Sequence, residues 1–345
     1  MRDSLRQLAL TRFREFIREP EAVFWALFFP ILLSVGLGIA FRNRPPEVVH
    51  VAVNADSPAA REALEALRAD SGLAADSLGA DGAREALRTG RVALVVHMDS
   101  AGRASYEYDD TRPDSRNARL MVNDALQRAR GRTDPVAVSE RHVRERGSRY
   151  IDFVIPGLLG LGLMGNGVWA IGFTIVDARR KRLLKRLMAT PMSRAEYLLS
   201  FIISRFALLI VEVLLLVGFA ALVFDVPLRG SFVQLIAICV LGALSFCALG
   251  LLLAARPKTV EGANGLMNLA MVPMWILSGV FFSAENFPDA IQPFIQALPL
   301  TAVNDALRAN MLRGAGLDVV GSELAILAAW GVVSFALALR LFRWR

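Results

Sequence analysis

Six apolar stretches, each about as long as a membrane-spanning helix, constrain this chain more than any other feature. A helix that crosses the bilayer core needs roughly 20 apolar residues. Four of the stretches contain no charged residue: 22–41, 153–176, 231–255 and 262–284. Two more, 206–224 and 319–339, contain one acid each, Glu212 and Glu323. Because soluble core helices of this length are normally amphipathic, the sequence predicts an α-helical polytopic membrane protein with six transmembrane helices.

The basic residues show how such a chain would be oriented. Arginine and lysine are enriched in short cytoplasmic loops. Six spans would place four basic segments on one side of the membrane: 2–18, 179–186, 256–258 and 340–345. The opposite short loop, 225–230, carries one acid and one base. We therefore expect both termini in the cytoplasm, and this asymmetry accounts for the formal charge of +7 without a nucleic-acid partner.

The N-terminal segment 1–20 alternates arginines with apolar residues such as Leu8 and Phe13. This pattern is typical of a basic amphipathic helix that lies among the lipids at the cytoplasmic interface. We expect Pro20 to end it before the first transmembrane helix, 21–41. That stretch is too long for the apolar region of a signal peptide and has no A-x-A site after it, so the sequence predicts a retained anchor.

The segment 42–149 reads as a water-soluble domain between the first and second spans. Its strand-like runs are 47–54, 91–98 and 104–108, and its helical runs are 58–69, 82–89 and 115–130. Ser57 stands where the first of these helices needs an N-cap. Strands that alternate with helices favour a small α/β domain, which the charge pattern places outside the cytoplasm.

Motifs of enzyme chemistry are missing from the sequence. It contains no G-x-x-x-x-G-K-[ST], no H-E-x-x-H and no G-x-S-x-G pattern. His50, His97 and His142 have no metal-ligand spacing, and Cys239 and Cys247 fall in the fourth apolar stretch, where packing is the expected role. We expect no catalytic residue, metal or cofactor in this chain.

A few polar residues inside the apolar stretches are candidates for function. An acid near the bilayer centre costs several kcal/mol unless it is paired or hydrated, so Glu212 lies either on a translocation path or subunit seam, or in a structural pair with a neighbouring span. Asn166, Asn264 and Asn268 are milder candidates for the same path or seam. The second stretch is also rich in glycine, which allows either close helix packing or a mobile helix; the glycines singled out are Gly157, Gly160, Gly162, Gly165 and Gly167.

Two blocks of the sequence carry a resemblance to a known family. The first block is residues 150–205. It contains the motif I-P-G-L and, at 185–197, the motif K-R-L-x-A-T-P-x-S-R-x-E-Y. The second block is residues 281–314. Both resemble the permease subunits of ABC exporters of the second type, the daunorubicin-resistance-like family. The resemblance implies a five-helix transmembrane domain over 150–345 after the outer domain, with short outer helices within 285–316.

The resemblance also implies how such a permease is driven. In the family, the cytoplasmic segment that corresponds to 177–197 couples the permease to an ATPase subunit. The matching residues are Arg186, Leu187, Met188, Ala189, Thr190, Pro191, Met192, Ser193, Arg194 and Glu196. Ser193 and Glu196 also have the spacing of a capping box. A second contact would involve Arg256, Lys258 and Glu261.

The implied complex is a bacterial exporter of the inner membrane. The partner ATPase would bind ATP and magnesium, and a second permease copy would complete the complex. The apolar spans suit a lipophilic substrate: a drug, a lipid or a lipid-linked compound. Two other functions fit a polytopic membrane protein. One is a stand-alone secondary transporter or channel, and the other is a membrane sensor or scaffold that uses its outer domain.

Overall fold

The computed structural model describes residues 13–14, 16–41, 48–54, 57–99, 102–133, 136, 138–139, 147–180, 194–257 and 259–341. At residue 22, at 177–180 and at 194–205 the description covers the backbone. The chain forms two compact units: Met1–Arg42 with Val143–Arg345, and Asn43–His142.

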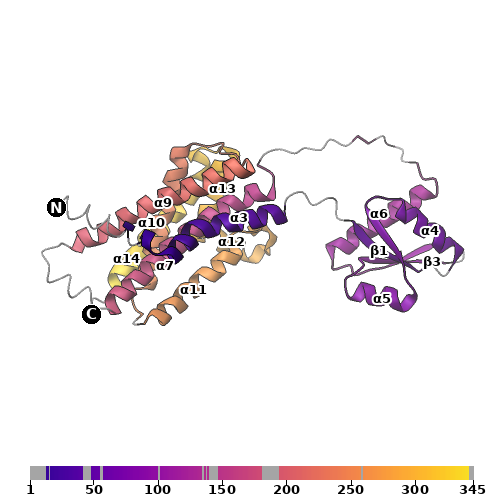
Figure 1. Ribbon diagram of the computed structural model, residues 1–345, viewed down its shortest axis with the longest axis horizontal. Coiled ribbons are helices and arrows are strands. Elements are labelled where there is room, and N and C mark those ends of the chain that lie inside the picture. Colours follow the sequence, from indigo (N-terminus) through magenta and orange to yellow (C-terminus); the bar gives the residue numbers. More distant parts are fainter. Residues whose placement is uncertain are drawn as a thin grey trace. The chain divides into compact units, whose positions relative to one another are not determined.

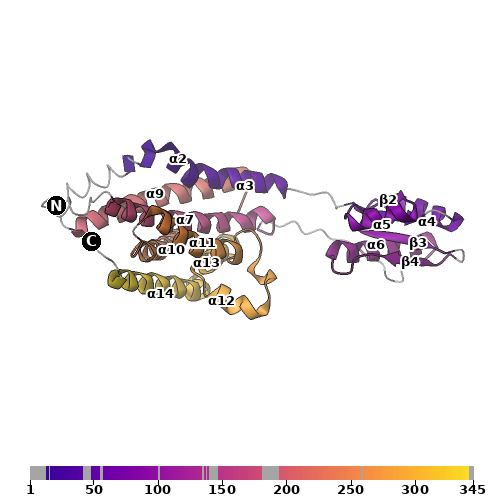
Figure 2. The ribbon, with the colours of Figure 1, turned by 90° about the horizontal axis from the view of Figure 1, so that it is seen from below.

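The larger unit is a bundle of helices (Figure 1). Its elements are α2 (Pro20–Val23), the π-helix η1 (Phe24–Phe28), α3 (Phe29–Ala40), α7 (Tyr150–Arg180), α9 (Arg194–Phe224), α10 (Phe232–Leu253), α11 (Val260–Leu277), the 3₁₀ turns η2 (Ala284–Asn286) and η3 (Asp289–Ile291), α12 (Gln292–Gln296), α13 (Pro299–Arg313) and α14 (Leu317–Leu341). Helix α7 contacts α3, α9, α10, α11 and α13. Figure 2 shows α3 and α14 on opposite sides of the bundle, with α7 between them.

Four helices in the described part of the chain are long and apolar enough to cross a membrane. They cover Tyr150–Val176, Phe206–Phe224, Phe232–Leu253 and Leu317–Leu341. The first predicted span is a shorter apolar helix, Phe24–Ala40. The structure therefore shows a polytopic membrane protein built around these spans.

The fifth predicted span ends earlier than its apolar composition suggests. The sequence predicts helix as far as Ala284, but α11 ends at Leu277 and the prediction is wrong for residues 278–284. Gly279 turns the chain with a φ of 69°, a conformation that glycine adopts without strain. The chain then continues through η2, η3 and α12 into α13.

The two ends of the bundle carry different elements. At the α13 end, Phe41 packs on Tyr150 with ring centroids 4.1 Å apart, and Tyr150 Oη donates to the Phe281 carbonyl at 2.9 Å. The link between α9 and α10 also lies at this end. The bond from the Arg149 side chain to the Asp225 carbonyl places it there. The Arg180 end holds the end of α7, the start of α9, the turn between α10 and α11, and the end of α14.

The smaller unit is a four-stranded sheet covered by three helices (Figure 1). Its strands are β1 (Val49–Asn54), β2 (Leu73–Ser77), β3 (Leu94–Met98) and β4 (Ala104–Glu107), and its helices are α4 (Pro58–Arg68), α5 (Ala80–Arg88) and α6 (Pro113–Ala129). The strand order is β2-β1-β3-β4; β1 is parallel to β2 and β3, and β4 is antiparallel. Val51 and Val53 face the core under α4 and α6, whereas Ala52 faces α5.

Strand β2 is absent from the sequence prediction. Its residues read LAADS, with no β-branched or aromatic side chain to indicate a strand. It forms because β1 offers a free edge, and the register pairs Val49 with Leu73. The resulting parallel β-α-β units give this segment an α/β arrangement.

The N-cap of α4 gives a test of this unit. The Ser57 Oγ accepts the Ala60 amide hydrogen at 3.1 Å, and loss of such a cap costs about 1 kcal/mol. We expect Ser57→Ala to speed hydrogen exchange of the first-turn amides of α4 about fivefold in the full-length protein. The exposed Ser71→Ala variant is the control, and equal exchange in both variants would contradict the role of the cap.

Candidate functional site along helix α7

Glycines on α7 let neighbouring segments approach its backbone. A Cβ added at Gly157 would lie 2.5 Å from the Val280 carbonyl oxygen, and one at Gly167 would lie 2.5 Å from Phe246 Cβ. From the facing helix, a Cβ at Gly250 of α10 would meet the Val168 carbonyl at 2.7 Å. The α7 backbone is therefore packed directly against α10 and against the turn after α11.

Two of these glycines make room for polar side chains. The added Cβ at Gly160 would overlap Asn304 Oδ1 from α13, and the one at Gly162 would overlap Glu212 Oε1 from α9. Asn304 is fully buried and Glu212 is 6% exposed. The glycines thus leave room for these two oxygens to lie against α7.

Glu212 and Asn166, singled out separately in the sequence, come together across the contact between α7 and α9. Asn166 Nδ2 donates to Glu212 Oε2 at 2.8 Å. An amide donor lowers the cost of keeping a carboxyl group away from water. This pair is the polar centre of an otherwise apolar cluster that includes Leu163 and Val213.

The other two asparagine candidates lie on α11. Asn264 is half-buried and Asn268 is exposed. Their one-turn spacing places them along one side of a helix that packs on α7 and α10. In a single copy of the chain, Asn268 therefore faces outward from the bundle.

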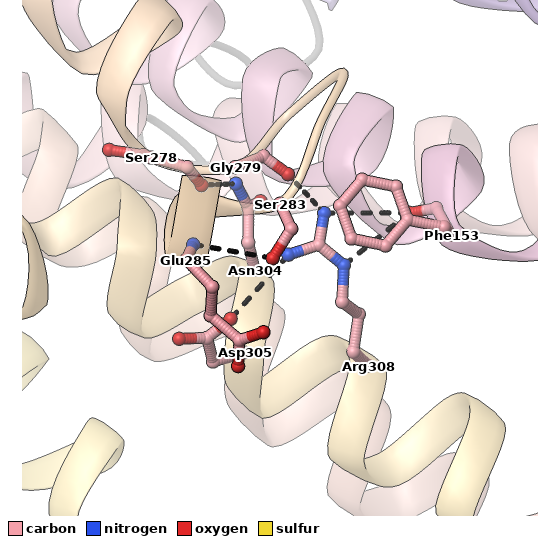
Figure 3. A network of polar contacts seen from close by, with 8 residues as sticks. All are labelled: Phe153, Ser278, Gly279, Ser283, Glu285, Asn304, Asp305 and Arg308. Carbon is pink, nitrogen blue, oxygen red and sulfur yellow. Dashed lines mark hydrogen bonds and ion pairs between the residues drawn. The ribbon is translucent and has the colours of Figure 1, made fainter. Parts of the chain in front are cut away.

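A second polar cluster lies at the α13 end (Figure 3). The Arg308 guanidinium donates to the Gly279 carbonyl and, at 3.4 Å, to the Phe153 carbonyl, and its Cζ lies 3.8 Å from the centroid of the Phe153 ring. Arg308 Nη1 also lies 3.5 Å from Asp305 Oδ1, and Asn304 Nδ2 donates to the Ser278 carbonyl at 2.8 Å. This Arg308 cluster joins α7, the turn after α11 and α13.

Burial shapes the chemistry of Arg308. Its side chain is only 13% exposed, and desolvation lowers its pKa to about 10, against the opposing effect of Asp305. The guanidinium stays charged at neutral pH. A buried charge of this kind needs several acceptors, and the two carbonyls, the ring face and the carboxylate supply them.

Sequence reasoning missed the Arg308 cluster. Its acceptors are mainly backbone carbonyls, which have no signature in the sequence. The usable signal is the spacing of Asn304 and Arg308, which places two polar side chains one turn apart on one helix.

Comparison with known proteins identifies the family. A model of the ABC-2 family transporter proteins matches residues 21–340, nearly the whole chain. This chain belongs to the ABC-2 transporter family. The resemblance carried by the I-P-G-L and K-R-L-x-A-T-P-x-S-R-x-E-Y blocks is thereby confirmed.

Several permeases are similar to this ABC-2 chain. The inner membrane transport permease YhhJ of Escherichia coli K12 is 24% identical over 64% of this chain and 60% of its own length. The probable multidrug ABC transporter permease YbhS of the same bacterium is 26% identical over 47% of this chain and 43% of its own. The linearmycin resistance permease protein LnrN of Bacillus subtilis 168 is 25% identical over 49% and 44%. The alignments thus span 60% or less of the length of these relatives.

Most residues of the predicted ABC-2 coupling segment lie outside the described residues. These are Arg186, Leu187, Met188, Ala189, Thr190, Pro191, Met192 and Ser193, together with Lys258 of the second contact. Arg194 and Glu196 lie in the first turn of α9, where the backbone is helical. Arg256 and Glu261 are both exposed on either side of the α10–α11 turn. Their roles stay predictions.

The glycine contacts predict an order of stability among three variants of this ABC-2 chain. Gly167→Ala drives a methyl into Phe246 and the α10 backbone, and overpacking of this kind costs about 1–3 kcal/mol. Gly162→Ala displaces only the flexible end of Glu212, so we expect a smaller loss. Gly165 has nothing within 4 Å, and Gly165→Ala is the matched control. Melting temperatures in detergent should rank Gly165→Ala highest and Gly167→Ala lowest; three equal values would refute the packing.

A double-mutant cycle tests the polar pair. Glu212→Leu leaves the Asn166 amide without this acceptor, at a cost of about 1–3 kcal/mol, whereas Glu212→Gln retains an acceptor oxygen and should cost less. Asn166→Leu combined with Glu212→Leu should recover part of the loss, because neither partner is then left unpaired. Unfolding free energies from reversible detergent titration give the coupling, and additive losses would show that the two side chains do not interact.

Proposed function

We propose that this chain is the membrane-spanning permease subunit of an ATP-driven ABC exporter, powered by an ATPase on a separate chain. The match of residues 21–340 to the ABC-2 transporter family carries the proposal. The similar proteins named as permeases support the transport role. The partner ATPase would bind ATP and magnesium, since this sequence has no P-loop pattern.

The proposed topology has six spans in a bacterial inner membrane. Helices α2, η1 and α3 run without a break from Pro20 to Ala40, about 30 Å at 1.5 Å per residue, which matches a bilayer core of about 30 Å. Helix α11, with 18 residues, is about 27 Å long. These two helices would be the first and fifth spans.

Charge supports the orientation of this bundle. Arg18, Arg194, Arg256 and Arg340 all belong to the Arg180 end. At the α13 end, by contrast, Arg149 and Arg308 are paired with Asp152 and Asp305. By the positive-inside rule, the Arg180 end and both termini would be cytoplasmic, and the α/β unit would lie outside the cytoplasm.

The length of two helices supports a docking role for the segment between them. Helices α7 and α9 have 31 residues each, about 46 Å, which exceeds the bilayer core by about 15 Å. In the sequence, charged residues follow Val176 in α7 and precede Phe206 in α9, so the polar ends of both helices lie at the Arg180 end. The segment 186–196 would therefore stand clear of the lipid, where an ATPase could bind it together with Arg256, Lys258 and Glu261.

The proposal extends to the substrate and to the assembly of the complex. The apolar spans suit a lipophilic drug, lipid or lipid-linked compound, and one similar protein is named a probable multidrug permease. A second copy of the permease would complete the path. Glu212 and Asn166 at the contact of α7 and α9, and Asn264 and Asn268 on α11, are the polar residues we assign to that path or to the seam between copies.

The ATPase contact can be tested in a purified complex. We expect the ATPase encoded beside this gene to co-purify with the chain and to hydrolyse ATP faster in its presence. Replacing residues 190–194 with a Gly-Ser linker should remove this stimulation, because the segment would no longer present a fixed surface. The same replacement at 138–142 is the control. Stimulation that survives the first replacement would disprove the role of the segment.

A further inference from the structure

The two halves of α7 are held very differently. In the half that begins at Tyr150, the side chains of Val154, Ile155, Leu158 and Leu159 are at most 1% exposed. In the half that ends at Arg180, Trp169 is 39% exposed and Phe173 is 47% exposed on a single copy. The first half is enclosed by protein, whereas the second has a free side.

Backbone atoms, not only side chains, fix the enclosed half. The missing Cβ of Gly157 lets the Val280 carbonyl lie against α7. Arg308 reaches the Phe153 carbonyl and covers the Phe153 ring while it bonds the Gly279 carbonyl. One cation thus fastens α7 and the turn after α11 to α13 (Figure 3).

The first turn of α7 has further ties to its neighbours. Arg149 makes two bonds to Asp152, at 2.9 and 2.8 Å, and its Nη2 donates to the Asp225 carbonyl after α9 at 3.1 Å. Asp152 is fully buried. Tyr150 Oη bonds the Phe281 carbonyl. The start of α7 is therefore bonded to the end of α9 and to the turn after α11.

We propose that the Tyr150 half of α7 is a fixed pivot, and that Arg308 is the positioning residue that holds it against α13. The proposal rests on the proposed function, in which ATP-driven force enters through the segment after Arg180. That force would move the Arg180 half of α7, together with the part of α10 that Gly167 and Gly250 hold against it, relative to α11, while the Tyr150 half keeps its neighbours throughout the cycle.

The contacts favour a pivot over a gate that opens in each cycle. A gate would have to withdraw the guanidinium from two carbonyls and an aromatic face at a site with little water, and separating a buried charge from its partners is strongly unfavourable. It would also have to part the Gly157 backbone from Val280. Packed contacts of this kind switch between discrete arrangements or remain closed.

Two spin-label pairs in the intact complex with its ATPase test the pivot, in a Cys239→Ala/Cys247→Ala background. One pair, Ser148→Cys with Arg313→Cys, reports the Tyr150 half of α7 against α13. The other pair, Phe173→Cys with Leu266→Cys, reports the Arg180 half against α11. Distances are measured by pulsed electron paramagnetic resonance without nucleotide and after trapping with ATP and vanadate.

We expect the first distance to stay unchanged and the second to shift by at least about 2 Å. A shift in the first pair as large as that in the second overturns the pivot, and so does a complex that hydrolyses ATP with neither distance changed. Failure of any ATPase to associate would instead refute the proposed function, so the two failures are distinguishable.

Variants of Arg308 test its positioning role in the same assay. Arg308→Gln loses the charge and the planar fork of donors, so the first distance should broaden and become sensitive to nucleotide. Arg308→Lys keeps the charge but not the planar fork of donors, so the distribution of the first distance should have an intermediate width. This variant provides the test if Arg308→Gln does not fold. Asp289→Asn, at an exposed position in η3, is the control and should match the unmodified chain. A fixed first distance in both Arg308 variants would remove Arg308 from this role.

Discussion

Direct contact between the backbone of α7 and its neighbours is the constraint on which the bundle depends. Within a membrane, helices gain little from the hydrophobic effect when they associate, so close van der Waals packing through small residues takes its place. Gly167 receives Phe246 of α10, and Gly250 of α10 receives the Val168 carbonyl of α7. The two helices therefore share a seam in which each supplies a glycine, and the other spans pack around it.

The same small residues explain why polar groups can lie inside the bundle. Gly160 and Gly162 leave room for Asn304 and Glu212, each contributed by a different helix. A polar side chain that bonds within the bundle is tolerated, and it fixes the rotation of one helix relative to the next. Arg308 and Asn304 add polar contacts to the Tyr150 half of α7, whereas the Arg180 half carries the Asn166–Glu212 pair and the glycine seam with α10.

The sequence predicts much of this fold because the membrane imposes simple rules. Apolar runs with at most one acid predicted the four long apolar helices. The alternation of elements predicted the α/β unit, and a serine before Pro58 predicted the cap that Ser57 forms. Strand β2 could not be predicted because its stability comes from pairing with β1, not from its own residues. The early end of α11 depends on the φ of Gly279, which an apolar sequence does not reveal.

The candidate site was predictable in part, for physical reasons. Glu212 and Asn166 stood out because polar groups are costly in apolar spans, but 46 residues separate them and only the fold shows that they bond. Arg308 was overlooked because its acceptor on Phe153 is a backbone carbonyl 155 residues away. Two polar side chains within apolar spans can each be recognised in a sequence, whereas a backbone carbonyl that accepts a hydrogen bond cannot.

If the ATPase of another chain drives this permease through the segment after α7, the two must be in contact in the cell. Site-specific photo-crosslinking in intact cells tests it most directly, with a photoreactive amino acid at Thr190 and, for comparison, at Gln234 near the α13 end. We expect a covalent adduct with the ATPase from Thr190 and none from Gln234. An adduct from Gln234 alone, or none from either position while the ATPase is present, would contradict it.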